Sequence, residues 1–137
     1  MPEKPLVYLT REIPRDGLDL LEEHCEVHVW PDPVEPPKER LVERLSELEA
    51  DALYCNVADT VDEEVLDASP NLRAIGTISV GYDHIDLEAA RERGIAVGHT
   101  PGVLAETTAD LGWALLMAGA RRIVEAHGRV RDGERET

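Results

Sequence analysis

The chain has 137 residues, of which 29 are Asp or Glu and 14 are Lys or Arg, so its formal net charge at neutral pH is −15. A chain of this length can bury one hydrophobic core but not two independent ones, so we expect one domain with at most an appended segment. The acidic excess argues against binding to nucleic acid or to an anionic membrane surface, because both require a basic face. No apolar run approaches the roughly 18 residues of a membrane span.

The N-terminal residues and the cysteines favour a cytoplasmic location. Met1 to Pro5 lead directly into a β-prone run and lack the charged and then apolar order of a signal peptide. Cys25 and Cys55 are far apart in the sequence, and each lies within an apolar stretch. We therefore expect two buried thiols rather than a redox pair or a metal site.

Lysine is almost absent from the basic residues. Only Lys4 and Lys38 are lysine, and the other basic residues are arginine. An arginine preference with a large acidic excess is consistent with adaptation to high salt, and equally with a GC-rich genome. The sequence leaves both interpretations open.

Apolar periodicity alternates along the chain between short β-prone runs and helical patterns. In chain order, the predicted elements are strand 6–10, helix 14–24, strand 26–30, helix 38–48, strand 52–55, helix 63–68, strand 72–78, helix 87–93 and strand 95–99. Asp62 and Asp86 are positioned to cap the N-termini of the last two helices. Repeated strand-helix-strand units predict an α/β fold with a flavodoxin-like, five-stranded parallel sheet of order 2-1-3-4-5 and helices on both faces.

A longer helix is predicted over residues 105–127, after the break at Pro101-Gly102. Leu111, Leu115 and Leu116 make it apolar on more than one side, and a helix of this kind requires packing partners on both sides. The charged residues 128–137 predict no following strand. We therefore expect either self-association at this helix or a further part of the protein beyond it.

The segment 76–86, Gly-Thr-Ile-Ser-Val-Gly-Tyr-Asp-His-Ile-Asp, holds the largest number of candidate chemical groups. Gly76 and Gly81 have the spacing of a phosphate-binding P-loop, but Tyr82 and Asp83 stand where Lys and Ser or Thr are required. None of the ten glycines is two residues from another, so the G-x-G-x-x-G dinucleotide fingerprint is also missing from the sequence. Both nucleotide-binding motifs are therefore excluded within this chain.

The same segment has features of two further kinds of site, and both are incomplete. Ser79 resembles the serine of a nucleophile elbow, but the first glycine of that motif is missing. Asp83, His84 and Asp86 lie too close together in one turn to enclose a metal ion, and no second cluster completes a coordination shell. The remaining interpretation is a turn whose backbone amides bind an anion at the carboxyl end of a central strand.

Four segments of the chain, in order, resemble the D-isomer-specific 2-hydroxyacid dehydrogenases. They are 80–86 (VGYDHID), 93–97 (RGIAV), 100–103 (TPGV) and 107–111 (TTADL). Residues 9–14 and 52–62 are similar to the glyoxylate and hydroxypyruvate reductase branch of that family. The resemblance implies an oxidoreductase that reduces a small 2-keto acid with NAD or NADP, and in its full-length form acts as a homodimer. It implies a substrate domain over 1–100, and a linking helix with the start of an NAD(P)-binding domain over 101–137.

The resemblance also implies roles for individual positions. The substrate-binding positions would be Ser79, Val80, Gly81, Asn56 and Val57. In the family pattern, backbone amides of the Val80-Gly81 turn bind the substrate carboxylate, and the Asn56-Val57 loop closes over the substrate. Val80 and Thr108 match positions beside the nicotinamide, with core packing and helix capping as open alternatives. Arg11 follows the first strand and is expected to be a solvated surface arginine.

The catalytic residues of the family are a histidine, a glutamate and an arginine, and all three belong to the part of the family sequence that follows Thr137. The five histidines of this chain do not match the motif of the catalytic acid. We therefore expect no catalytic residue here, and predict that the 137 residues alone are inactive. The alternative is a truncated paralogue that acts as a carboxylate-binding or partner-binding module.

Overall fold

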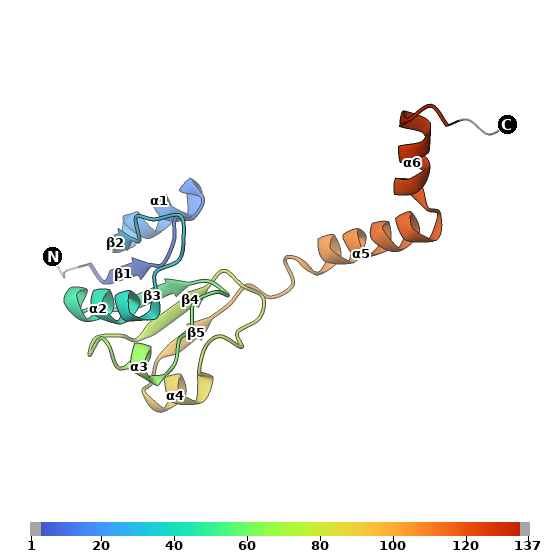
Figure 1. Cartoon of the computed structure of the whole chain (residues 1–137). Helices are drawn as coiled ribbons and strands as arrows, with labels where there is room; N and C mark the ends of the chain where they lie inside the picture. Colours follow the sequence, from blue (N-terminus) through green and yellow to red (C-terminus); the bar gives the residue numbers. More distant parts are fainter. Residues whose placement is uncertain (1–3, 135–137) are drawn as a thin grey trace. The chain divides into compact units, whose positions relative to one another are not determined.

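The computed structural model describes residues 4–134, which divide after Pro101 into two units. The first unit alternates strands and helices (Figure 1). In chain order, its elements are β1 (Leu6–Leu9), α1 (Arg15–His24), β2 (Glu26–Val29), α2 (Lys38–Leu48), β3 (Ala52–Cys55), α3 (Glu63–Leu66), β4 (Ala74–Thr77), α4 (Leu87–Glu92) and β5 (Ala96–Gly98). The second unit contains α5 (Ala105–Ala120) and α6 (Ile123–Arg131).

The five strands form one sheet in the order β2-β1-β3-β4-β5, and every neighbouring pair is parallel. The register places Leu53 of β3 beside Tyr8 of β1 on one side and beside Ile75 of β4 on the other. The predicted flavodoxin-like sheet is thereby confirmed. Because all the strands are parallel, their carboxyl ends meet at one edge of the sheet.

Helices cover both faces of the sheet, and the side chains of β1 show why. Successive residues of a strand point to opposite faces. Val7 and Leu9 pack with Leu18 of α1 on one face, whereas Tyr8 packs on the other face in the cluster that includes Leu45 of α2. The core is therefore built from two layers of side chains, one on each side of the central strands.

Side-chain caps fix the start of the two short helices, as the sequence predicts. The Asp62 carboxylate accepts a hydrogen bond from the Val65 amide at the start of α3, and Asp86 accepts one from the Ala89 amide at 2.9 Å at the start of α4. The cysteines fit the prediction only in part. Cys55 is buried, but Cys25 is half-buried.

The predicted helix over 105–127 is wrong in one respect, because it is divided into α5 and α6. Arg122 has a φ of 51°, in the left-handed region, which interrupts the helical hydrogen bonds. Its guanidinium donates to both carboxylate oxygens of Glu125, each at 2.6 Å. No helix within residues 4–134 has the combination of length and apolar character that a membrane span needs.

Candidate functional site

Three loops follow the carboxyl ends of β1, β3 and β4, which are neighbours in the sheet. They begin at Thr10, Asn56 and Ile78. The backbone links them, because the Thr10 amide donates to the Tyr54 carbonyl at 3.0 Å and the Ile78 amide donates to the Cys55 carbonyl at 3.3 Å. This edge is where parallel α/β sheets bind ligands.

A buried carboxylate, that of Asp59, joins the first two loops. Its Oδ2 atom accepts hydrogen bonds from the Thr10 hydroxyl at 2.6 Å and from the Asn56 amide at 2.9 Å. The Asn56 side-chain oxygen accepts from the Ala58 amide at 2.8 Å, which closes a tight turn. Asp59 is not among the predicted site residues, although an Asn followed by Asp three residues later, just after a strand, is a recognisable turn signal.

Several buried polar atoms near these loops have no hydrogen-bond partner within the part of the chain that the structure describes. They are the Tyr8 hydroxyl, the Asn56 side-chain nitrogen and the Oδ1 atom of Asp59. Burial raises the pKa of Tyr8 to about 12, and it raises the pKa of the Cys55 thiol to about 12 as well. Both groups are therefore neutral near pH 7, and neither supplies an anion at this edge. Val57, in contrast, is 71% exposed.

The hydroxyl groups at the end of β4 form a small cluster with one imidazole. Thr77 Oγ1 lies 2.6 Å from Ser79 Oγ and 3.0 Å from His84 Nε2, whereas Ser79 Oγ lies 3.5 Å from the same nitrogen. The histidine therefore binds Thr77 more closely than Ser79. This geometry does not suit a serine nucleophile, which needs its base within hydrogen-bonding reach.

The backbone amides of Val80 and Gly81 have no acceptor among residues 4–134. The Ser79 carbonyl accepts from the Thr100 amide at 3.1 Å, and the Val80 carbonyl accepts from His99 Nδ1 at 2.8 Å. Val80 itself is 40% exposed, so its side chain is not part of the core. Two free amide donors thus lie in the loop after a central strand, where they can bind an anion.

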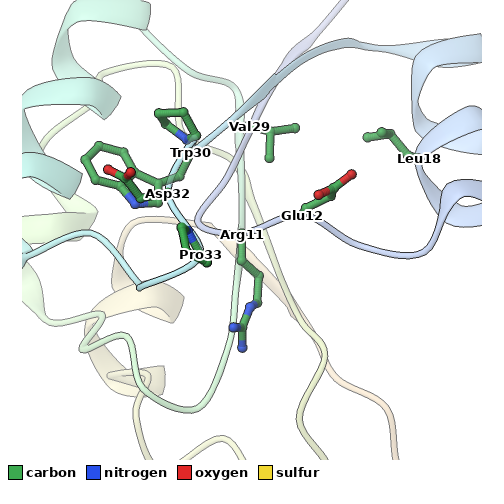
Figure 2. A pocket seen from close by; sticks show the side chains of 8 residues that line it. Arg11, Glu12, Leu18, Val29, Trp30, Asp32 and Pro33 are labelled. Carbon is green, nitrogen blue, oxygen red and sulfur yellow. The ribbon is translucent and has the colours of Figure 1, made fainter.

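Arg11 lies beside a cleft at the carboxyl ends of β1 and β2, with a volume of about 560 Å³. Figure 2 shows its side chain directed away from Trp30 and Leu18, which line the same cleft. The guanidinium pairs with Glu35 at 3.3 Å and is partly exposed. Within the described residues, Arg11 is therefore a paired surface arginine rather than a free anion-binding group.

Thr108 lies in α5, in the second unit. Its amide donates to the Leu104 carbonyl at 2.9 Å, as expected in the first turn of a helix. The N-cap of α5 is Leu104, and no side chain caps this helix end. Helix capping by Thr108 is therefore not observed.

The fold and this edge define a flavodoxin-like α/β domain with two free backbone amides in the loop after its fourth strand. Residues 7–133 match the family described as D-isomer specific 2-hydroxyacid dehydrogenase, catalytic domain. The chain belongs to this family, as the four sequence segments indicate.

Comparison with individual proteins gives the same family. The chain is 50% identical over 131 residues to a glyoxylate reductase of Korarchaeum cryptofilum. Its structure is similar to that of the TT0316 protein from Thermus thermophilus, with a TM-score of 0.83 and 48% identity over 96% of this chain and 42% of that one. It is also similar to D-lactate dehydrogenase from Aquifex aeolicus complexed with NAD and lactic acid, with a TM-score of 0.72 and 25% identity over 96% of this chain and 38% of that one.

The match covers nearly all of this chain but a smaller share of its relatives. The aligned region is 96% of this chain and 39% of the Korarchaeum cryptofilum protein. More than half of that relative therefore has no counterpart in the 137 residues.

Proposed function

We propose that this chain is the N-terminal, substrate-binding part of an NAD(P)-dependent 2-hydroxyacid dehydrogenase that reduces glyoxylate, hydroxypyruvate or a similar small 2-keto acid. The observation that carries the proposal is the pair of free backbone amides at Val80 and Gly81, at the carboxyl end of a central strand. The identity to a glyoxylate reductase supports this class of substrate.

In the proposed role, the Val80 and Gly81 amides bind the substrate carboxylate. Amides suit this task because they donate hydrogen bonds without adding a titratable group. Ser79 lies beside them with its hydroxyl bound to Thr77. Asn56 is fixed by the turn at Asp59, whereas Val57 is exposed at the loop tip and is available to cover a bound substrate.

This chain offers a contact for the nicotinamide end of the cofactor, but its sequence has no glycine-rich loop to bind the phosphates. The partly exposed, apolar Val80 can contact a nicotinamide ring, and we propose it for that contact. The sequence offers no G-x-G-x-x-G turn for a pyrophosphate. When bound, the cofactor supplies the hydride, while this chain orients the keto acid. Thr108 remains a predicted cofactor contact in α5.

The parts of the chain have separate proposed tasks. We propose residues 1–100 as the substrate domain and 101–137 as the linking helix with the start of a cofactor domain. The division of the structure after Pro101 supports this arrangement. A homodimer of the longer protein is proposed on the resemblance alone.

Two samples test the proposal, namely the product of the full reading frame and the 137-residue chain alone. We expect the reading frame beyond Thr137 to encode G-x-G-x-x-G within a few dozen residues, and its full product to oxidise NADH or NADPH with glyoxylate or hydroxypyruvate. The 137 residues alone should give no turnover in the same absorbance assay, since they lack a phosphate-binding loop and the family's catalytic acid. A full product that is inactive with every small 2-keto acid would contradict the proposal, and turnover by the 137 residues would contradict their predicted inactivity.

A binding module is the second candidate, and the exposed apolar side chains of α5 favour it. Leu111, Trp113 and Leu115 are each more than 60% exposed. An exposed apolar surface of this kind is typical of an interaction site. The intact mass of the natural protein separates the candidates, because a natural product that ends at Thr137 favours the module.

A further inference from the structure

The two residues that follow β5 hold three consecutive carbonyls in the loop after β4. Thr100 Oγ1 donates to the Ile78 carbonyl at 2.7 Å, and the Thr100 amide donates to the Ser79 carbonyl at 3.1 Å. His99 Nδ1 lies 2.8 Å from the Val80 carbonyl oxygen. Because a carbonyl can only accept, Nδ1 of the imidazole carries the proton in this bond.

These bonds control the direction of the two free amides. The described residues contain no cis peptide bond, and in a trans peptide unit the C=O and N–H groups point in opposite directions. The Ser79 carbonyl shares a peptide unit with the Val80 amide, and the Val80 carbonyl shares one with the Gly81 amide. Holding both carbonyls toward the end of β5 therefore aims both N–H groups away from it.

The peptide unit between Val80 and Gly81 needs such a restraint, because glycine permits a wide range of backbone angles. Packing supplies little restraint of its own. A Cβ atom built at Gly81 would meet only Asp83 Oδ2, at 3.5 Å, which is an ordinary contact. The imidazole that provides the restraint is itself oriented by Tyr82, since the two rings are edge-to-face with centroids 5.2 Å apart.

We propose that His99 is a positioning residue for carboxylate binding, which acts by holding the Val80 carbonyl so that the Gly81 amide faces the substrate. The inference rests on the proposed function, because it assigns a task to His99 at the proposed carboxylate site. His99 does not touch the substrate in this role. The essential feature is a hydrogen-bond donor at the position of Nδ1, and not the imidazole as such.

Two substitutions test whether the hydrogen-bond donor or the bulk of the His99 side chain is required. His99→Leu removes the donor and keeps comparable bulk. His99→Asn restores a donor, because the side-chain nitrogen of asparagine is as many bonds from Cβ as Nδ1 of histidine. His99 is exposed, so neither substitution disturbs the core, and unchanged amide shifts in β3 serve as the control for folding.

The measurements are NMR spectra of the 15N-labelled chain, first without ligand and then with sodium oxalate at constant ionic strength. Without ligand, we expect His99→Leu to increase the motion of the Gly81 amide in relaxation experiments, and His99→Asn to leave it unchanged. With oxalate, we expect the Val80 and Gly81 amides to shift. Loss of one hydrogen bond predicts a dissociation constant about tenfold higher for His99→Leu and near the wild-type value for His99→Asn.

The outcomes distinguish a failure of the proposed carboxylate site from a failure of the proposed role of His99. If the wild-type Val80 and Gly81 amides do not respond to oxalate, the proposed carboxylate site is wrong, and with it the role of His99. If they respond equally in wild type and His99→Leu, only the role of His99 is wrong. Equal weakening in both variants would also overturn it, because the donor would then not be the cause.

Discussion

In the first unit Leu45 of α2 has no exposed surface, whereas in the second unit Leu116 of α5 is 59% exposed. The difference follows from the sequence pattern of the two helices. The apolar residues of α2 lie on one face, where Leu41 and Leu45 pack on the sheet. The apolar residues of α5 surround the helix, and none is buried. A helix with one apolar face is satisfied by one sheet, but a helix that is apolar all round needs partners on every side.

The two regions differ in charge as well. Residues 1–101 carry 23 acidic and 9 basic side chains, a net charge of −14, whereas residues 102–137 carry 6 acidic and 5 basic side chains, a net charge of −1. The acidic surface therefore belongs to the sheet domain. The buried core and most of the negative charge therefore lie in the first unit, and the second unit carries exposed apolar surface without a buried core.

The largest expected difference between the two units is the effect of matched leucine substitutions on the free energy of unfolding. Leu45→Ala in α2 should lower the free energy of unfolding by about 3 kcal/mol, because it leaves a cavity in the core. Leu116→Ala in α5 should change it by less than about 0.5 kcal/mol, since the side chain is already exposed. Urea denaturation followed by circular dichroism measures both values. Equal costs for the two variants would show that α5 contributes to the same core.

A smaller difference in the free energy of unfolding is expected within the first unit, between a buried carboxylate and an exposed one. Asp59→Ala should destabilise the fold by about 2 kcal/mol, because the donors of Thr10 and Asn56 lose their buried acceptor. Asp67→Ala is the matched control. Its carboxylate binds Arg93 at the surface, where water screens the pair, so its removal should cost much less than that of Asp59. The same urea experiment tests both, and a cost for Asp59→Ala no larger than that for Asp67→Ala would contradict a structural role for the buried carboxylate.

The smallest expected effect concerns the charge difference. Salt screens repulsion between like charges, so raising sodium chloride from 10 mM to 1 M should stabilise the acidic first unit. We expect a gain of about 1 kcal/mol, or about 5 °C in Tm. The same change should leave the helical content of a peptide covering residues 102–137 unaltered. Unchanged Tm in molar salt would exclude adaptation to high salt, and the arginine preference would then reflect the genome.

The sheet domain was predictable because each of its elements is marked locally. Short β-prone runs and one-sided helices gave the strand order, and Asp62 and Asp86 marked two helix starts correctly. The break at Arg122 is not predictable in this way, because the apolar pattern continues across it. A pattern of side chains does not reveal a single residue in the left-handed conformation.

The candidate site was predictable only as a set of positions. The sequence motif identified Ser79, Val80 and Gly81, and their roles remain predictions. It did not identify Asp59 or His99, because each acts on a residue distant in the sequence or on a backbone atom. Asp59 binds Thr10 across 49 positions, and His99 binds the Val80 carbonyl across 19.

The sequence by itself determined the family, the parallel sheet and the excess of negative charge, since these follow from local patterns and from composition. The tertiary structure alone decided which polar groups are satisfied and which are free. The direction of the Val80 and Gly81 amides depends on the hydrogen bonds that the residues after β5 make to the Ser79 and Val80 carbonyls. Hydrogen-bond partners are set by distances between segments that fold together, and no local pattern encodes those distances.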